Sequence, residues 1–467
     1  MPKMNLDRQY AGLLEGQRQF FNTRQSRDLS FRKTQLKKLK SVLFDNEGLL
    51  LEAIRSDFGK SPFDTIATEL GVLAMDIDEN ISGLSNWSRK VKVPTNLINF
   101  PGRSYVIPEP LGNSLIIGAW NYPYQISLSP LIAAIAAGNT AVLKPSELAA
   151  GTSAAMAEII NSNFPEEFIH VVEGGVEETT ALLKLKFDKI FFTGSTRVGK
   201  IVYKAAAENL CPVTLELGGK SPAIVTRDSK LKTTARRIVW AKFLNAGQTC
   251  IAPDYALIDS RIADRFIEAL IEQIKKFDYK LENDNFTRII DNRNWERIVG
   301  LMDPEKVVFG GGHDRENRVI EPTVMRGVEM EDAVMQEEIF GPLLPVLTFD
   351  GIEEAIQKVK SLPRPLALYL FSNNSKIQKR VMREISFGGG AINETIMHIA
   401  NPNLPFGGVG ASGTGSYHGE AGFRAFSHYK SILEKPLWPD PYFKYPPYSL
   451  QKEKWMRWAL GWRKKKK

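Results

Sequence analysis

The chain has 467 residues, of which 43% are hydrophobic and 24% charged, a composition typical of a soluble globular protein with two or more domains. Its two cysteines cannot form a disulfide scaffold, which favours a reducing, cytoplasmic location, and its five histidines lack metal-ligand spacing, so no metal site is expected. The formal charge of +8 is concentrated in residues 452–467, which carry eight Lys or Arg against one Glu, and the nearly neutral remainder argues against nucleic-acid binding.

The chain is predicted to begin with helices and to continue as a parallel sheet. Apolar positions recur every three or four residues through about the first 90 residues, which predicts helices. Residues 91–109, "VKVPTNLINFPGRSYVIPE", predict extended chain. Short apolar runs then alternate with helical patterns, and the expected strands are "SLIIGAW", "TAVLKP", "IHVVEG" and "KIFFT". This alternation predicts an α/β protein with a doubly wound parallel sheet.

A charge-free stretch, residues 110–143, is broken by glycine, proline and asparagine. We therefore expect buried elements joined by turns there, and not a membrane-spanning helix. The N-terminus lacks the apolar segment of a signal peptide. A second α/β region is expected from "VTLELGG" and "SPAIVT" to about residue 420, with a strand at "PLALYLFS" and a flexible loop at "NLPFGGVGASGTGS".

One stretch has the pattern of a phosphate-binding turn. In "KIFFTGSTRVGKIV", an apolar strand runs through Gly194, Ser195 and Gly199 into a helix, whose first backbone amides could meet a phosphate. The glycine spacing differs from the usual G-x-G-x-x-G, so an ordinary α/β turn also fits.

The two cysteines have different surroundings. Cys211 precedes Pro212 at the start of a strand and is typical of a small buried apolar residue. Cys250 lies in "LNAGQTCIAPD" among small and polar residues, where a reactive thiol and a structural one are both reasonable. A thiol that attacks a carbonyl needs an oxyanion donor and a base. Asn121 in "GAWNYPY" and Glu216 in "TLELGGK" could serve, although a turn asparagine and an edge-strand glutamate are the simpler interpretations of each alone.

Seven motifs in order give the sequence a family resemblance. They are "PLGNSLIIGAWNYP", "AIAAGNTAVLKPSE", "FFTGSTRVGK", "VTLELGGKSP", "NAGQTCIAPD", "QEEIFGP" and "NLPFGGVGASG". Over about residues 5–435 the chain resembles the aldehyde dehydrogenase superfamily, and "GQTC" with "GSTRVGK" resembles its class 3 branch, which includes fatty aldehyde dehydrogenases. The resemblance implies a Rossmann-type cofactor domain, an α/β catalytic domain and a small β oligomerisation element. The expected domains are 1–92 with 110–215 for NAD(P) binding, 216–420 for catalysis, 93–109 with 428–440 for oligomerisation, and a basic tail at 446–467.

The resemblance also implies roles for individual residues. Cys250 would be the nucleophile, the Asn121 side chain and the Cys250 backbone N–H would hold the oxyanion, and Glu216 would activate water to hydrolyse the thioester. Tyr122 and Phe406 would line an aromatic substrate pocket.

The implied cofactor is NAD, with NADP also compatible. Its contacts would be Lys144 and Glu147 at the adenosine ribose, Gly194, Ser195 and Gly199 at the pyrophosphate, and Glu338 with Phe340 at the nicotinamide. Arg197, where many class 3 sequences have glycine, places a cation near the phosphates and could favour NADP.

The expected activity is NAD(P)-dependent oxidation of medium-chain, long-chain or apocarotenoid-type aldehydes to carboxylic acids by a homodimer. One alternative is a CoA-acylating aldehyde dehydrogenase, in which CoA replaces water; a hydrolytic base such as Glu216 argues against it. Another is a catalytically idle cofactor-binding or structural protein, but the sequence keeps both Cys250 and Asn121.

The basic tail suggests a membrane contact. Trp455, Trp458 and Trp462 are spaced by three and four residues, so a helix would place them within one narrow arc, with lysines following. This pattern is typical of an interfacial helix on an anionic membrane. The alternative is a tail that caps the substrate entrance or packs on a dimer partner.

Overall fold

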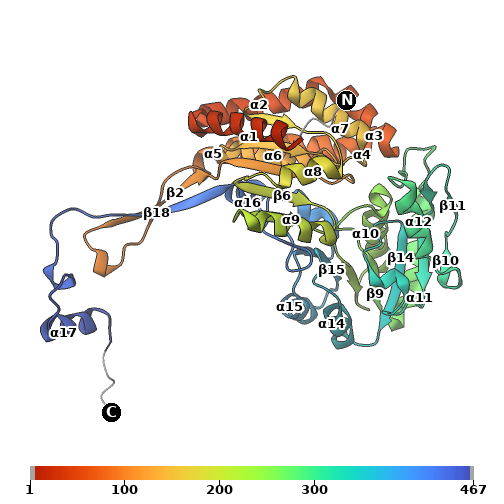
Figure 1. Ribbon diagram of the computed structural model, residues 1–467. Coiled ribbons are helices and arrows are strands. Elements are labelled where there is room, and N and C mark those ends of the chain that lie inside the picture. Colours follow the sequence, from red (N-terminus) through yellow and green to blue (C-terminus); the bar gives the residue numbers. More distant parts are fainter. Residues whose placement is uncertain (1–5, 463–467) are drawn as a thin grey trace, which may run out of the picture. The chain divides into compact units, whose positions relative to one another are not determined.

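The structure is a computed structural model that describes residues 6–462 (Figure 1). The chain divides into two compact units, one of Met1–Ser85 with Pro110–Ser427 and one of Asn86–Glu109 with His428–Lys467.

Helices account for most of residues 6–87, as predicted. They are α1 (Leu6–Asn22), η1 (Gln25–Arg27), α2 (Leu29–Asp45), α3 (Glu47–Phe58), α4 (Pro62–Thr65), the π-helical η2 (Ile66–Leu70) and α5 (Gly71–Trp87). Local chemistry sets their ends: Asp28 accepts hydrogen bonds from the Ser30 and Phe31 amides to begin α2, and Gly59, with φ of 72°, ends α3.

The first sheet has six strands in the order β17-β7-β6-β3-β4-β5. Its strands are β3 (Asn113–Ile117), β4 (Thr140–Lys144), β5 (Ile169–Val171), β6 (Lys189–Thr193), β7 (Val213–Glu216) and β17 (Gly413–Thr414). All pairs are parallel except β17 with β7. The connecting helices are α6 (Gln125–Ala137), α7 (Ala150–Asn161), α8 (Val176–Leu183) and α9 (Thr196–Glu208). The predicted doubly wound parallel sheet is confirmed.

Both faces of this sheet are covered. Leu115, Val142 and Ile190 point into a buried cluster with side chains of α1, α8 and α9. The opposite face packs against α6 and α7, and every residue of α6 is buried. Residues 110–143 are therefore core elements, because strands covered on both sides are apolar throughout.

The segment "VTLELGG" differs from its predicted place. We expected it to open the second α/β region, but its strand β7 pairs with β6 in the first sheet, with Thr193 beside Glu216. The reason is the α9 crossover, which returns the chain parallel to β6.

The second sheet has seven strands in the order β10-β13-β14-β9-β8-β15-β16. They are β8 (Pro222–Val225), β9 (Tyr255–Asp259), β10 (Val307–Phe309), β13 (Thr323–Arg326), β14 (Leu343–Phe349), β15 (Ala367–Phe371) and β16 (Gly389–Ile392). The accompanying helices include α10 (Leu231–Phe243), α11 (Ala263–Phe277), α12 (Asn292–Gly300), α13 (Ala333–Gln336), α14 (Ile352–Ser361) and α15 (Ser375–Glu384). The last helix of the larger unit, α16 (Gly419–Ala425), packs against α6 beside the first sheet. The strand predicted at "PLALYLFS" is confirmed as β15.

The smaller unit contains a three-stranded sheet in the order β1-β2-β18, followed by a helix. Its elements are β1 (Val91–Val93), β2 (Arg103–Pro110), β18 (Ser427–Glu434) and α17 (Leu450–Ala459). The extended chain predicted for 91–109 is confirmed.

The three tail tryptophans do not share one helix, which corrects the predicted arc. Trp455 and Trp458 lie on α17 with ring centroids 5.4 Å apart, but Gly461 adopts a φ of 67° and places Trp462 beyond the helix end. The Trp462 amide donates to the Arg457 carbonyl at 2.8 Å, a closing bond typical of a glycine-terminated helix. The cations of 463–467 lie outside the described residues. Within 6–462, no helix is long and apolar enough to cross a membrane.

Candidate functional site

Four predicted site residues lie at or just beyond the carboxyl ends of neighbouring strands in the first sheet. Lys144 ends β4 and Glu216 ends β7, while Gly194 follows β6 and Asn121 follows β3 after a short loop. The carboxyl ends of parallel strands meet at one edge of a sheet, where α/β proteins bind their ligands. β7 is not an edge strand, because β6 and β17 flank it.

A tight reversal of the chain precedes Cys250. After α10, Asn245, Ala246 and Gly247 have φ values of 53°, 52° and 76°. The left-handed region is unfavourable for residues other than glycine, so two of these three positions are strained. Such strain persists only where the surrounding contacts determine the backbone.

Two buried amide side chains hold this reversal. The Gln248 amide donates to the carbonyls of Asn245 and Arg288, both at 3.0 Å, and its oxygen accepts from the Ile290 amide at 3.0 Å. Asn245 Nδ2 donates to the Asn121 carbonyl at 2.9 Å and to the Gln248 carbonyl at 3.1 Å. The loop that carries Cys250 is thereby joined to the loop that carries Asn121.

The structure brings Asn121 to this loop. Its side chain is buried, and Nδ2 donates to the Gln248 carbonyl at 3.1 Å. An amide nitrogen carries two hydrogens, so one N–H is left to donate to a ligand.

Glu216 is a buried carboxyl group without hydrogen bonds. The residue is 3% exposed, and neither carboxyl oxygen accepts a hydrogen bond from any residue in the described part of the chain. Burial raises the pKa of Glu216 well above its ordinary value. In its ionised form such a group is a stronger base than an ordinary carboxylate.

The Cys250 thiol is held in its neutral form. Burial raises the thiol pKa most, and the nearby carboxylates of Glu338 and Glu216 raise it further. The backbone N–H groups of Cys250 and Ile251 oppose this shift. The charges of Glu216 and Glu338 therefore both act on the Cys250 thiol. Glu338 comes from a distant part of the sequence, the segment after α13.

Glu338 lies directly against the backbone at Gly218. A Cβ added at Gly218 would lie 1.9 Å from Glu338 Oε2, so a side chain at position 218 would displace the carboxylate. Burial and then Asp254 raise the Glu338 pKa to about 8. Phe340, two residues on, has a φ of 51° and meets Trp120 edge to face at 5.3 Å.

The remaining predicted cofactor residues form two groups. Lys144 is buried, its Nζ donates to the Pro145 carbonyl at 2.7 Å, and Glu147 Oε2 lies 3.9 Å away on a half-exposed side chain. Burial lowers the Lys144 pKa, and Glu147 partly restores it. Ser195 is the N-cap of α9 and accepts from the Val198 amide.

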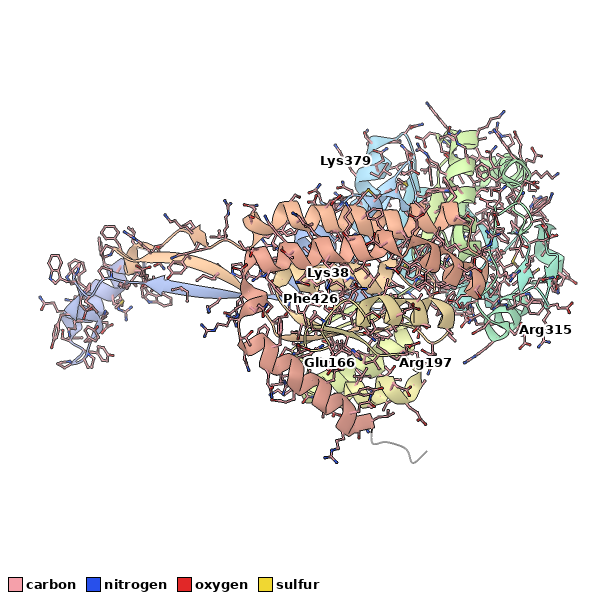
Figure 2. All side chains as sticks on the ribbon, turned by 90° about the horizontal axis from the view of Figure 1, so that it is seen from above. Lys38, Glu166, Arg197, Arg315, Lys379 and Phe426 are labelled. Carbon is pink, nitrogen blue, oxygen red and sulfur yellow. The ribbon has the colours of Figure 1, made fainter. Side chains whose placement is uncertain are left out.

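The glycines beside this cap are explained by close packing. At Gly199 an added Cβ would lie 2.7 Å from Leu217 Cδ2, so glycine lets α9 approach the end of β7. At Gly194 an added Cβ would lie 2.6 Å from Phe192 Cζ. Arg197, labelled in Figure 2, is exposed in the first turn of α9.

Both predicted pocket residues lie in the buried layer near the thiol. The Tyr122 hydroxyl is 2.7 Å from Thr249 Oγ1, next to Cys250. Phe406 stacks on His418 at 5.4 Å and meets Tyr417 edge to face at 5.8 Å. The pKa of Tyr417 is raised by burial and then by Glu216 and Cys250, which shows that Tyr417 lies near both groups. Phe406 is therefore connected to the site by its contact with Tyr417.

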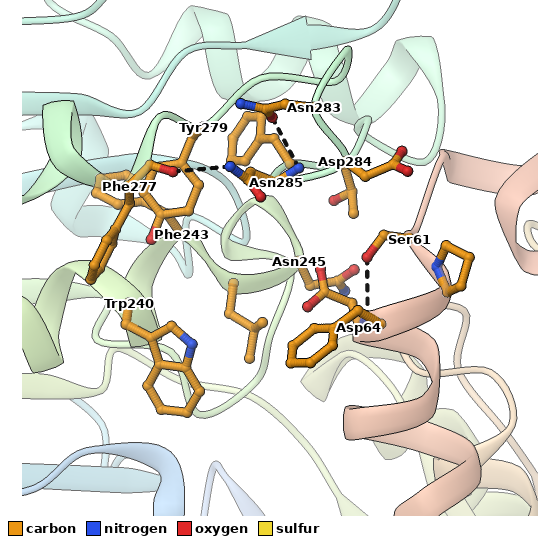
Figure 3. Close-up of a pocket in the computed structure, with 15 residues that line it drawn as sticks. Ser61, Asp64, Trp240, Phe243, Asn245, Phe277, Tyr279, Asn283, Asp284 and Asn285 are labelled. Carbon is orange, nitrogen blue, oxygen red and sulfur yellow. Dashed lines mark hydrogen bonds between the residues drawn. The ribbon is translucent and has the colours of Figure 1, made fainter.

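A pocket of about 400 Å³ is lined in part by Asn245 (Figure 3). Its lining residues are Ser61, Pro62, Phe63, Asp64, Trp240, Phe243, Leu244, Asn245, Phe277, Tyr279, Asn283, Asp284, Asn285, Phe286 and Thr287. Figure 3 shows Ser61 and Asp64 of the α4 segment facing Asn245, with Trp240, Phe243, Phe277 and Tyr279 opposite. Asn245 thus contacts both the pocket and the Asn121 loop.

Comparison with known proteins identifies the family. The model of the aldehyde dehydrogenase family matches residues 12–432. The chain belongs to the aldehyde dehydrogenase family. The 4,4'-diaponeurosporen-aldehyde dehydrogenase of Staphylococcus aureus is 48% identical over 433 residues, which cover 92% of this chain and 94% of that protein.

Further relatives support the class 3 branch. A Rattus norvegicus protein named aldehyde dehydrogenase family 3 member A2 is 44% identical, with 95% of this chain and 92% of that protein covered. The solved structure of Staphylococcus aureus AldH in its substrate-bound state has a TM-score of 0.94 and 45% identity, covering 97% of this chain and 99% of that one. The predicted family, fold class and enzyme class are confirmed.

The residues of this aldehyde dehydrogenase fit a nicotinamide dinucleotide, which the family uses. The exposed amino end of α9, with glycines before and within it, can meet phosphates, and Lys144 with Glu147 offers a cation and a carboxylate to a ribose. A Rattus norvegicus relative, 44% identical over 92% of this chain and 96% of its own, is named "dimeric NADP-preferring", and Pseudomonas syringae AldA, 28% identical, is solved with NAD+. Among residues 6–462, no group of three or more His, Cys, Asp or Glu is arranged to hold a metal ion.

Three features of the site were not predicted from the sequence. Lys60 and Glu69 form a buried ion pair behind the Asn121 loop. Lys242 Nζ is buried and has no hydrogen-bond partner among the described residues, and burial lowers its pKa to about 8. The third feature is the hydrogen bond from Asn245 to the Asn121 carbonyl. A helical sequence pattern does not show which distant residue a charged side chain contacts, so it could not identify these buried charged groups.

Glu338→Gln removes a carboxylate that raises the pKa of the Cys250 thiol. At about pH 9 the variant is therefore expected to react with iodoacetamide at Cys250 roughly threefold to tenfold faster, since one pKa unit changes the thiolate fraction about tenfold. The pKa of Glu338 is raised to about 8, so its carboxylate opposes the thiolate above that pH and is mostly protonated below it. At about pH 7 the two rates should agree within about twofold. The Cys250 peptide is followed by mass spectrometry, because Cys211 is a second thiol.

Glu337→Gln is the matched control, because Glu337 is half-exposed and pairs with Arg297 at 3.1 Å. An equal rate increase in both variants, or an increase confined to low pH, would contradict the coupling of Glu338 to the thiol.

Proposed function

We propose that this aldehyde dehydrogenase oxidises apolar aldehydes to carboxylic acids, with Cys250 as nucleophile, Asn121 as oxyanion donor and Glu216 as hydrolytic base. The observation that carries the proposal is the buried carboxyl group of Glu216, free of hydrogen bonds to described residues and electrostatically coupled to the Cys250 thiol. A hydrolytic route needs this base, whereas transfer to CoA does not.

The residues divide the chemistry among them. The Cys250 thiol releases its proton to water, Sγ forms a bond to the aldehyde carbon, and the carbonyl electron pair moves to oxygen. The Asn121 amide and the Cys250 backbone N–H donate to that oxyanion. NAD(P), when bound, accepts the hydride that leaves this carbon. Water then attacks the resulting thioester, Glu216 takes a proton from the water, and the Cys250 sulfur departs from the carboxylic acid.

The cofactor would be held by the residues described above. Lys144 and Glu147 would contact the adenosine ribose, Gly194, Ser195 and Gly199 the pyrophosphate, and Glu338 with Phe340 the nicotinamide end. Exposed Arg197 at the start of α9 supports tolerance of the extra phosphate of NADP.

Two further properties belong to the proposal. The chain forms a homodimer through residues 93–109 and 428–440, which is supported by the word "dimeric" in the name of the Rattus norvegicus relative. The protein works in the cytoplasm. Its NAD(P)-binding region comprises residues 1–92 and 110–215, and its catalytic region comprises residues 216–420.

The apolar substrate class is supported by the pocket of Figure 3. Aromatic side chains of α10 and of segment 277–286 line it, and Asn245 connects it to the Asn121 loop. The diaponeurosporen-aldehyde named for the Staphylococcus aureus relative is an apocarotenoid-type aldehyde. We assign the pocket to the apolar tail of the aldehyde, while Tyr122 and Phe406 surround its reactive end.

Cys250→Ser is expected to lower NADH formation from decanal by at least about 10³-fold, because the hydroxyl is a far weaker nucleophile. Glu216→Gln is expected to form about one NADH per chain in the first turnover and then to slow by about 10² to 10⁴-fold, because the thioester is not hydrolysed. Stopped-flow absorbance and intact-mass detection of the acylated protein measure both effects. Full turnover by Glu216→Gln, or acid formation that requires CoA, would contradict the hydrolytic route.

Trp240→Ala is expected to lower kcat/KM for decanal by about tenfold, since each buried methylene contributes about 0.8 kcal/mol. For propanal, whose two-carbon chain offers little apolar surface for the pocket to bury, the change should stay within about twofold. Phe44→Ala, at an exposed aromatic position of α2, is the matched control. An equal loss for both aldehydes would remove the pocket from the substrate path.

The tail is proposed to contact an anionic membrane. Leu437, Trp438, Tyr448, Trp455 and Trp458 are all exposed. Exposed aromatic rings beside lysines favour the interface of an anionic bilayer.

The intact chain is expected to float with phosphatidylglycerol vesicles and to lose this binding when residues 452–467 are removed, because both rings and cations are lost. Trp455→Ser with Trp458→Ser, which keeps every cation, separates ring insertion from charge attraction. Unchanged flotation after truncation would rule out the tail as the anchor. A change in kcat/KM without any vesicle binding would favour a tail that caps the substrate entrance.

A further inference from the structure

A buried ion pair contacts the segment that follows Asn121. Lys60 Nζ and Glu69 Oε1 are 2.6 Å apart, and both side chains are almost completely buried, at 1% and 0% exposed. Removing two charges from water costs several kcal/mol, so such pairs are weak evidence for added stability. Their retention is better explained by what the charged groups hold in place.

Glu69 lies in an unusual helical turn. Residues Ile66–Leu70 form the π-helical η2 between α4 and α5. π turns are rare and occur frequently at functional sites. The wide turn is closed at Gly71, where an added Cβ would lie 2.6 Å from the Ile66 carbonyl oxygen. Glu69 is the buried residue of this turn.

The second carboxylate oxygen of Glu69 begins α6. Oε2 accepts from the Tyr124 amide at 2.8 Å and from the Gln125 amide at 3.3 Å. The N-cap residue Tyr124 makes no side-chain capping bond in the described structure, so Glu69 caps α6 from 55 positions away. A carboxylate there also interacts favourably with the helix dipole. Asn121 precedes this fixed helix start by three residues.

Lys60 contacts the same loop through an aromatic ring. Its Nζ lies 4.1 Å from the centre of the Tyr122 ring, whose hydroxyl is 2.7 Å from Thr249 Oγ1. In the loop that carries Cys250, Asn245 Nδ2 donates to the Asn121 carbonyl at 2.9 Å. The Asn121 backbone is therefore held between the ion pair and the Cys250 loop.

We propose that the Lys60–Glu69 ion pair is a positioning unit that fixes the Asn121 amide where the substrate oxyanion forms. This role rests on the oxyanion role proposed above for Asn121. Glu69 sets the start of α6, Lys60 holds Glu69 and the Tyr122 ring, and neither residue needs to contact the substrate. An oxyanion donor must be aimed within a fraction of an ångström, so a small shift of the loop slows the chemical step.

The test is a double-mutant cycle on the rate of first-turnover NADH formation with decanal, using the full chain with NAD+. Asn121→Ala alone is expected to lower this rate by about 100-fold, and Glu69→Gln alone by about tenfold with a smaller change in KM. In the Asn121→Ala background, Glu69→Gln is expected to change the rate by less than about twofold, because residues that act through one another are not additive.

Alkylation of Cys250 by iodoacetamide provides a second readout. This reaction forms no oxyanion, so Glu69→Gln should leave its rate within about twofold of wild type. A general loosening of the structure would alter alkylation together with turnover.

The outcomes separate the two proposals. An unchanged rate in Asn121→Ala would overturn the oxyanion role of Asn121 itself. Two other outcomes would overturn only the positioning role of the ion pair and leave the role of Asn121 intact. In both, Asn121→Ala lowers the rate, but Glu69→Gln either has equal effects in the two backgrounds or has no effect. If Glu69→Gln does not yield folded protein, the cycle is run with Lys60→Met and Glu69→Gln together, which leaves no unpaired buried charge. The same non-additivity is then expected, and additive effects overturn the proposal.

Discussion

The site depends on the left-handed reversal at Asn245–Gly247, which turns the chain out of α10 and presents Cys250. Two of its three residues have side chains and adopt positive φ at a cost of about 1 to 2 kcal/mol each. Hydrogen bonds from Gln248 and Asn245 compensate for this cost, and one of them reaches the carbonyl of Asn121. The loop that carries Cys250 and the loop that carries Asn121 are therefore joined by hydrogen bonds, although 129 positions separate Asn121 and Cys250 in the sequence.

Burial shifts the pKa values of the titratable groups of the site and makes their charged forms energetically costly. The Glu216 carboxyl group receives no hydrogen bond from the described residues, and the pKa values of Glu216, Glu338 and Cys250 are all raised chiefly by burial. A fold selected only for stability would satisfy or remove these groups. Their presence together is expected for a site in which protons must move between a thiol, water and a carboxylate.

The parallel sheet could be predicted because short apolar runs that alternate with helical patterns are typical of α/β proteins. Motif order then placed Cys250, Glu216 and Asn121, whose roles remain predictions. Pairing was harder: β7 joins the first sheet because of the α9 crossover, which local pattern does not encode. Spacing alone also placed Trp462 on the tail helix, whereas Gly461 ends the helix before it. Contacts such as Lys60 with Glu69 depend on a π turn, for which the sequence offers no periodic signal.

The ion pair also suggests why the helical N-terminal segment belongs to the catalytic unit. α6 is buried along its whole length and its N-cap residue supplies no capping side chain, so its start would be poorly determined without a partner from elsewhere. Glu69 provides that partner, and a carboxylate this deeply buried requires a cation such as Lys60. The same segment supplies Ser61 and Asp64 to the pocket that Asn245 borders. Residues 60–69 therefore connect the Asn121 loop with the walls of the pocket of Figure 3. If Asn121 is the oxyanion donor as proposed, this segment couples the geometry of the chemical step to that of the proposed substrate path.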